Sequence, residues 1–85
     1  MRRVVFHGKA FEQFTGWAKE DPALFERLTR LITESSRDPF VGIGKPEPLR
    51  NELKGYWSRR LTQEHRLVYK VTDDSIIIAS CRYHY

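Results

Sequence analysis

The sequence contains a single cysteine, no long apolar run and no secretion signal. Cys81 has no partner for an internal disulfide, so the fold does not depend on oxidation. No apolar run is long enough to cross a bilayer, and the opening MRRVVFHG lacks the apolar region and the cleavage site of a signal peptide. These absences exclude a disulfide-stabilised scaffold and predict a protein of the reducing cytoplasm.

Residue spacings typical of metal and nucleotide sites are also missing. His7, His65 and His84 have no ligand spacing with one another or with the cysteine. The segment GIGK at residues 42–45 is similar to part of a phosphate-binding loop, but it lacks the spacing, the Ser/Thr and the following helix. Cys81 lies in an apolar segment with no cation placed to activate its thiol. We predict no metal and no other cofactor.

The composition predicts one folded domain, residues 1–85. Hydrophobic residues make up 40% and aromatic residues 13%, which is enough for a packed core and too much for a disordered polycation. The net charge is +4: residues 1–44 carry seven basic and six acidic side chains, and residues 45–85 carry eight and five. A basic excess in the second half favours a polyanion-binding surface, although a charge of this size distinguishes little by itself.

The first half predicts a short strand followed by two helices. Residues 2–6 are typical of a strand, and residues 9–20 carry apolar residues at helical spacing. Asp21 and Pro22 predict the N-cap and first turn of a second helix, which should end by Asp38 and Pro39. The expected apolar stripes are Phe11, Phe14, Trp17 and Ala18 in the first helix, and Leu24, Leu28, Leu31 and Ile32 in the second.

The second half predicts a stiff loop and three antiparallel strands. Prolines flank Glu47 in the loop FVGIGKPEPLRNEL, and strands are expected at residues 56–61, 65–71 and 76–83, the last in a central position. Strand alternation places Arg66 and Lys70 on the face opposite Leu67, Tyr69 and Val71. The predicted fold is α+β, in the order β-α-α-β-β-β, with both helices on one face of a small, mostly antiparallel sheet and an open cationic face.

Four residues form a candidate catalytic set: Glu47, Arg66, His84 and Tyr85. Cleavage of RNA through its own 2′-hydroxyl needs a base, a cation that holds the charge of the phosphorane, and an acid for the leaving 5′-oxygen. A glutamate, an arginine and a histidine can fill these roles in that order. Taken singly, each has an ordinary interpretation: a solvated glutamate, an arginine paired with Glu64 or Asp74, and an exposed histidine.

Four short segments occur together in the second half: GKPEPL, GYWSRR, EHRLVY and CRYHY. In this combination they are similar to the YoeB toxins of the RelE superfamily of bacterial toxin–antitoxin systems. The resemblance is close over residues 37–85 and looser over the helical first half. It implies a RelE-like microbial RNase fold, a homodimer, and a YefM-like antitoxin whose acidic segment folds over the toxin.

The resemblance also implies a function, a ribosome-dependent endonuclease that cuts mRNA in the ribosomal A site and halts translation. Glu47 would be the general base, Arg66 the stabiliser of the transition state, His84 the general acid, and Tyr85 a residue that orients the substrate. Glu64 would organise the arginine cluster. The implied RNA-binding residues are Lys45, Arg50, Arg60 and Arg82.

Two alternatives stay open from the sequence. One is a non-catalytic module that binds RNA or the ribosome through Arg60, Arg66 and Tyr85, and the other is a ribonuclease that needs no ribosome. A further question concerns the last strand, because strict alternation sends His84 and Tyr85 to opposite faces. If both serve one site, the strand must twist or end near Tyr83.

Overall fold

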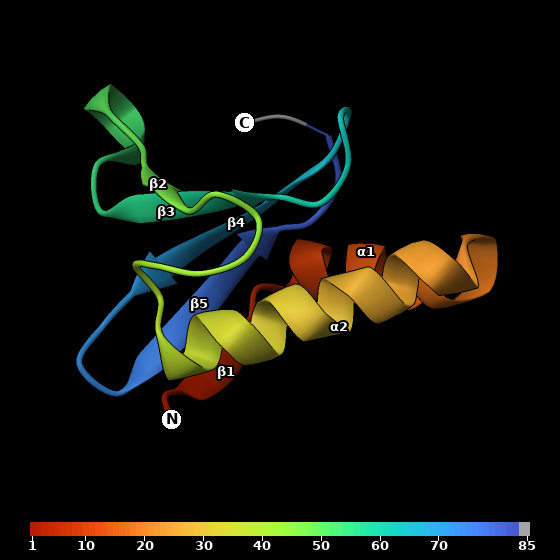
Figure 1. Ribbon diagram of the computed structural model, residues 1–85, viewed down its shortest axis with the longest axis horizontal. Helices are drawn as coiled ribbons and strands as arrows, with labels where there is room; N and C mark the ends of the chain where they lie inside the picture. Colours follow the sequence, from red (N-terminus) through yellow and green to blue (C-terminus); the bar gives the residue numbers. More distant parts are fainter. Residues whose placement is uncertain (84–85) are drawn as a thin grey trace.

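Two helices and a five-stranded sheet make up the computed structural model, which describes residues 1–83 (Figure 1). The elements are β1 (Arg3–Phe6), α1 (Gly8–Glu20), α2 (Pro22–Arg37), β2 (Glu47–Pro48), a 3-10 turn η1 (Asn51–Leu53), β3 (Tyr56–Arg60), β4 (Arg66–Val71) and β5 (Ser75–Ser80). Both helices lie on the same side of the sheet, so the expected α+β class is confirmed. Within residues 1–83, no helix is long and apolar enough to span a membrane.

The strand order in the sheet is β1-β5-β4-β3-β2. The strand β5 pairs in parallel with β1 and antiparallel with β4, so it has neighbours on both sides, as expected for the last strand. The strand β2 was not predicted. Its two residues, Glu47 and Pro48, pair with Ser58 and Trp57 of β3, so Glu47 lies at a sheet edge rather than in a free loop.

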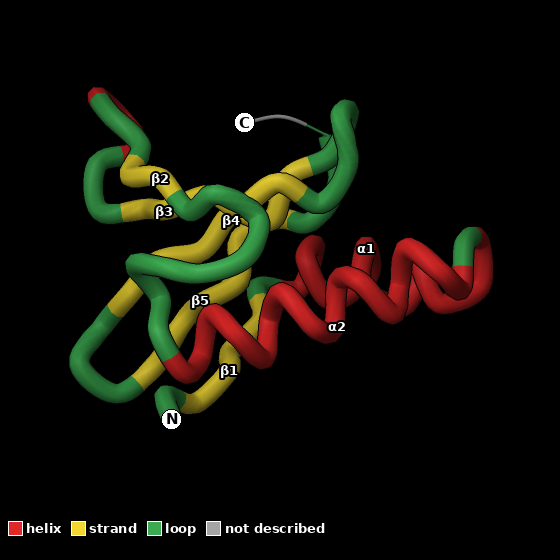
Figure 2. The backbone as a smooth tube through the Cα atoms, in the orientation of Figure 1, coloured by secondary structure: helices red, strands yellow, loops and turns green. Residues whose placement is uncertain are grey.

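Local capping fixes the boundaries of α2. The Asp21 side chain accepts a hydrogen bond from the Leu24 backbone N–H at 3.1 Å, and Pro22 occupies the first turn, where its missing N–H costs nothing. The helix ends at Arg37, directly before Asp38. Figure 2 shows the short connection between the two helices. Both predicted boundaries are therefore confirmed.

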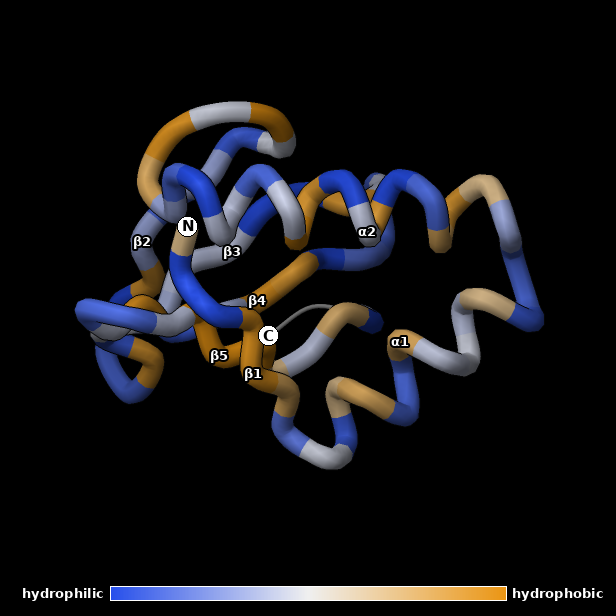
Figure 3. Tube along the Cα trace, turned by 90° about the horizontal axis from the view of Figure 1, so that it is seen from below, coloured by the Kyte–Doolittle hydropathy of each residue, from blue (hydrophilic) through white to orange (hydrophobic). Residues whose placement is uncertain are grey.

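The apolar stripe predicted for α1 was partly wrong. Trp17 is buried, but Phe11 is 52% exposed and Ala18 is also exposed. Ala10 takes the buried place instead, and the thiol of Cys81 lies 3.7 Å from its carbonyl oxygen. The small side chain at position 10 allows α1 to approach the end of β5 closely. In Figure 3, the middle of β5 is coloured hydrophobic, whereas α2 alternates between polar and apolar residues.

A buried arginine holds the loop that leads to β2. Arg59 is 0% exposed and lies on the same face of the sheet as the buried Tyr69. Its guanidinium donates to the backbone carbonyls of Asp38, Val41 and Ile43 at 2.5, 3.1 and 2.9 Å, and its Nε donates to the Tyr69 hydroxyl at 3.0 Å. These bonds satisfy the buried cation and anchor the loop.

The last strand ends earlier than predicted, at Ser80 rather than at residue 83. The backbone of Tyr83 has φ +63°, a left-handed conformation that interrupts an extended strand. Strict alternation therefore ends before Tyr83. His84 and Tyr85 lie outside the described residues.

Candidate functional site

The register of the strands places a row of side chains across the open face. Glu47 lies opposite Ser58, Ser58 opposite Val68, and Val68 opposite Ser80. Directly opposed residues of antiparallel strands project from the same face. Ser58 and Val68 are buried although they belong to the face expected to be open, and they form the floor of the candidate site.

Glu47 and Arg66 meet above this floor. Arg66 Nη1 donates a hydrogen bond to Glu47 Oε1 at 3.3 Å, which makes an ion pair between β2 and β4. The Arg66 side chain is 17% exposed and that of Glu47 is 54% exposed. A carboxylate and a guanidinium, both accessible from one side, are thus held within one hydrogen bond of each other. The sequence predicted both residues but not this contact.

A second arginine lies next to Arg66, on the neighbouring strand β3. Arg60 is exposed and lies directly opposite Arg66 in the β3–β4 register. Like charges in this arrangement repel each other and destabilise a sheet. Lys70, further along β4, is also exposed. The structure therefore concentrates positive charge on this face, as alternation predicted. The repulsion between these charges lowers the stability of the sheet, and a bound polyanion would reduce it.

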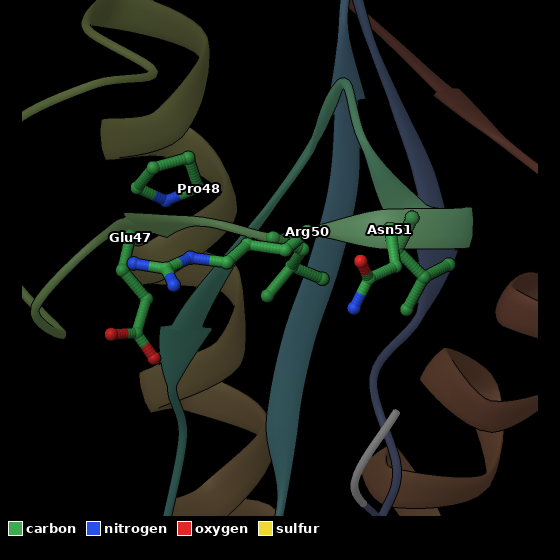
Figure 4. Close-up of a pocket in the computed structure, with 6 residues that line it drawn as sticks. Glu47, Pro48, Arg50 and Asn51 are labelled. Carbon is green, nitrogen blue, oxygen red and sulfur yellow. The ribbon is translucent and has the colours of Figure 1, made fainter.

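A hollow of about 680 Å³ adjoins Glu47. Its lining runs from Glu47 through the turn η1 and includes Arg50, which is exposed and extends toward Glu47 (Figure 4). Lys45 is exposed two residues before Glu47 and adopts a left-handed backbone with φ +51°. Three of the four predicted RNA-binding cations are therefore close to the ion pair. Arg50 lines the hollow beside Glu47, Lys45 is two residues before Glu47, and Arg60 pairs with Arg66 in the strand register.

Arg82, the fourth of these cations, is directed toward α1. Both of its terminal nitrogens donate to the Glu20 carboxylate at 2.8 Å, and its guanidinium carbon lies 4.3 Å from the centre of the Trp17 ring. The bidentate hydrogen bond raises the pKa of Arg82 and lowers that of Glu20. Arg82 therefore fastens the segment after β5 to a helix.

Glu64, predicted to organise the arginines, contacts a histidine instead. Its Oε1 lies 3.5 Å from Nε2 of His65, and Arg66 takes Glu47 as its carboxylate partner. Asp74, the other partner considered for Arg66, pairs with Arg3 at 3.3 Å. The histidine itself had no predicted role.

His65 is buried, at 8% exposure, between α1 and the end of the chain. Its Nδ1 accepts a hydrogen bond from the Tyr83 backbone N–H at 2.8 Å, and its ring meets the Trp17 ring edge-on at 4.8 Å. No periodicity indicated this contact, because it joins residues 18 positions apart with β4 and β5 between them. The signal in the sequence was the place of His65 in the segment EHRLVY, directly before Arg66.

A family model and curated relatives match nearly the whole chain. Residues 6–85 match the model of the YoeB-like toxin of bacterial type II toxin-antitoxin systems. The chain belongs to the YoeB-like toxin family. The resemblance found in the sequence is therefore confirmed. Toxin RelK of Mycobacterium tuberculosis is 55% identical over 85 residues, which cover 100% of each chain.

Solved structures of YoeB-like toxins have the same fold. A YoeB/ParE toxin from Agrobacterium tumefaciens is 38% identical, with a TM-score of 0.94 over 98% of this chain and 99% of that one. YoeB of Staphylococcus aureus, 42% identical, is known as a dimer (TM-score 0.90, covering 99% of this chain and 98% of that one) and in a heterotetrameric complex with YefM (0.89, covering 100% and 99%). The implied RelE-like fold is confirmed.

Proposed function

We propose that this YoeB-like toxin is a cytoplasmic endoribonuclease that cleaves mRNA in the A site of the ribosome and so stops translation. The observation that carries the proposal is the ion pair of Glu47 with Arg66 on the cationic face of the sheet. One group of the pair can accept a proton, and the other can hold the negative charge that develops on a phosphate.

In the proposed reaction, Glu47 accepts the proton of a 2′-hydroxyl while that oxygen attacks the adjacent phosphorus. The guanidinium of Arg66 stabilises the negative charge of the phosphorane. The bond to the 5′-oxygen then breaks, His84 supplies the proton to this leaving group, and the products are a 2′,3′-cyclic phosphate and a free 5′-hydroxyl. Tyr85 orients the substrate. No metal takes part.

The geometry of Arg66 supports its role. Within residues 1–83, the only hydrogen bond from its side chain goes from Nη1 to Glu47, and a guanidinium carries five donors in a rigid fork. A phosphate can therefore be bound while the contact with the base is kept. The repulsion between Arg60 and Arg66 further favours an anionic ligand at this place.

The small size of this face supports a need for the ribosome. Basic side chains gain affinity for RNA by releasing counterions, but reading bases requires more recognition surface than a few strand residues provide. The ribosome holds the message in a fixed geometry, and fixing the reactants supplies a large part of catalysis. Lys45, Arg50, Arg60 and Arg82 are the residues proposed to bind the message or ribosomal RNA.

The proposed partners follow from the S. aureus relative, which is known as a dimer and in complex with YefM. We expect this chain to form a homodimer and to be neutralised by a YefM-like antitoxin. An acidic segment of such a partner would pair with Arg60, Arg66 and Lys70, the cations of the open face. Binding there would exclude RNA from Glu47.

A time course with translating ribosomes and a defined message tests the proposal. New 5′ ends at A-site codons are expected within the first minutes, and naked message should stay intact. Ribosome binding without new 5′ ends would favour the non-catalytic module. Equal cutting of naked RNA would show a ribonuclease that acts without the ribosome.

A further inference from the structure

We propose that His65 is a positioning residue that places the general acid by fixing the backbone of Tyr83. This inference rests on the proposed function, because it concerns the residue that directly precedes His84. The contact is a single hydrogen bond, from the Tyr83 N–H to Nδ1 of His65 at 2.8 Å. Both partners come from segments far apart in the chain.

The next residue completes the attachment of Tyr83. The backbone N–H of Arg66 donates to the Tyr83 carbonyl at 3.1 Å, so two consecutive residues of the chain bind both backbone polar groups of Tyr83. The side chain of the second residue, Arg66, contacts Glu47. His65 and Arg66 therefore join the end of the chain to the proposed base and cation through one short segment.

The conformation of Tyr83 needs such an attachment. A φ of +63° is unfavourable for a tyrosine and persists only where the surroundings enforce it. Tyr83 directly precedes His84, the proposed general acid, in the sequence. If the hydrogen bond to His65 is lost, the backbone of Tyr83 can relax toward the extended region.

The histidine is itself held in one orientation. Its ring packs against those of Trp17 and Tyr83, at centroid distances of 4.8 and 5.4 Å. Its backbone N–H donates to the Thr62 hydroxyl at 3.0 Å. Because a backbone N–H can only donate, Nδ1 must present its lone pair, and the neutral ring then carries its proton on Nε2, toward Glu64.

Three substitutions separate the hydrogen bond from the packing of the ring. In His65→Asn the amide oxygen takes nearly the position of Nδ1, so the acceptor is kept and the ring is lost. In His65→Phe the ring is kept and the acceptor is lost. In His65→Gln the amide lies nearer the position of Nε2, so an acceptor at the place of Nδ1 is again absent and a polar side chain remains.

The first measurement is single-turnover cleavage on ribosomes over a range of toxin concentrations. The Phe and Gln variants should cleave at least about tenfold more slowly at saturation, which corresponds to about 1.4 kcal/mol, and the Asn variant should stay within about threefold of the unsubstituted protein. The half-saturating concentration should not change. A packing role predicts the opposite order, with Phe faster than Asn, and that order overturns the proposal.

The second measurement is amide hydrogen exchange at Tyr83 in the free protein. This amide should be protected in the unsubstituted and Asn proteins and exchange faster in the Phe and Gln variants, provided that thermal unfolding shows all of them to be folded. Equal exchange in all four proteins overturns the inference whatever the cleavage assay shows. Absence of cleavage by the unsubstituted protein contradicts the proposed function alone.

Discussion

Glu47 provides the most direct test of the proposed chemistry at the scale of single residues. Glu47→Gln keeps an oxygen that can accept the hydrogen bond from Arg66, but the amide cannot take a proton. Single-turnover cleavage should fall by about 10²–10⁴-fold, the usual contribution of a general base. Ribosome binding, measured by co-sedimentation, should stay nearly unchanged. An unaltered cleavage rate would remove Glu47 from the mechanism.

Cys81 makes a separate prediction about pH. Burial raises the pKa of its thiol to about 12, whereas an unfolded cysteine titrates at about 8.5. Between these values only the unfolded chain loses the proton, so the contribution of Cys81 to stability is present below pH 8.5 and is lost as the pH rises toward 12. It should fall by about 1.7 kcal/mol between pH 8.5, where half of the unfolded thiols are already ionised, and pH 10.

Urea unfolding at the two pH values measures this loss, with Cys81→Ala as the control. Other groups titrate in the same range, so the quantity of interest is the difference in pH dependence between the two proteins. Between the two pH values, the free energy of unfolding of the alanine variant should fall by about 1.7 kcal/mol less. Identical pH dependence of the two proteins would show that the thiol is not shielded.

Sequence reasoning identified the chemical groups of the site better than their contacts. Alternation correctly placed Arg66 on the face away from the helices. It could not predict Glu47 as the ion-pair partner of Arg66, because this contact depends on an edge strand two residues long. The pairing of Arg82 with Glu20 and the contact of His65 with Tyr83 depend on the bend after β5. Contacts formed through turns follow from three-dimensional packing, and no local pattern encodes them.

At the scale of elements, the loop before β2 depends on a glycine. Gly44 has φ +80°, and a Cβ at this position would lie 2.9 Å from Leu31 Cδ2, 3.1 Å from Arg59 Cβ and 3.2 Å from the Arg60 carbonyl oxygen. The Gly44 carbonyl accepts a hydrogen bond from the Arg60 N–H at 2.6 Å, so the loop cannot move away without breaking it. The close approach brings the loop onto β3.

Gly44→Ala should therefore be strongly destabilising, and Gly55→Ala is its matched control. Gly55 also has positive φ, +97°, but a Cβ there meets nothing within 4 Å. Both substitutions introduce backbone strain, and only the first adds a clash, so it should cost about 1–3 kcal/mol more in the free energy of urea unfolding. Equal losses of unfolding free energy in the two variants would mean that the loop moves to accommodate the new Cβ without further loss of stability.

Elements with local signals, β1 and β5 among them, were predicted, whereas β2 and the pairing between distant strands were not. The Asp21 cap and the following proline define the start of α2 within four residues of sequence. The strand β2 exists only because β3 lies beside it, and the parallel pairing of β1 with β5 joins Arg3 to Ser75. The end of β5 at Ser80 was missed because Cys81 and the residues after it fit a strand equally well by composition.

At the scale of the whole molecule, the positive charges of the open face lower the stability of the fold and favour the binding of RNA. Arg60 and Arg66 oppose each other, so Arg60→Gln should raise the free energy of unfolding by about 0.2–1 kcal/mol. The same change should weaken ribosome binding and reduce its dependence on salt concentration. Urea unfolding and co-sedimentation at two salt concentrations measure the two effects.

Arg30→Gln serves as the control, because Arg30 is exposed on α2 and the change in net charge is the same. It should alter neither stability nor binding by a comparable amount. If both variants weaken binding equally, net charge rather than the open face attracts the ribosome. If Arg60→Gln lowers stability, the two arginines do not repel each other in solution.

The central place of β5 also bears on when this toxin can fold during its own synthesis. Residues 75–80 are made after all other strands, yet they lie between β1 and β4 and supply Ile76 and Ile78 to the core. Until they leave the exit tunnel, β1 has no sheet partner and the core is incomplete. Folding of the core must then wait for residues 75–80, and a chain that stops before them leaves β1 without a sheet partner.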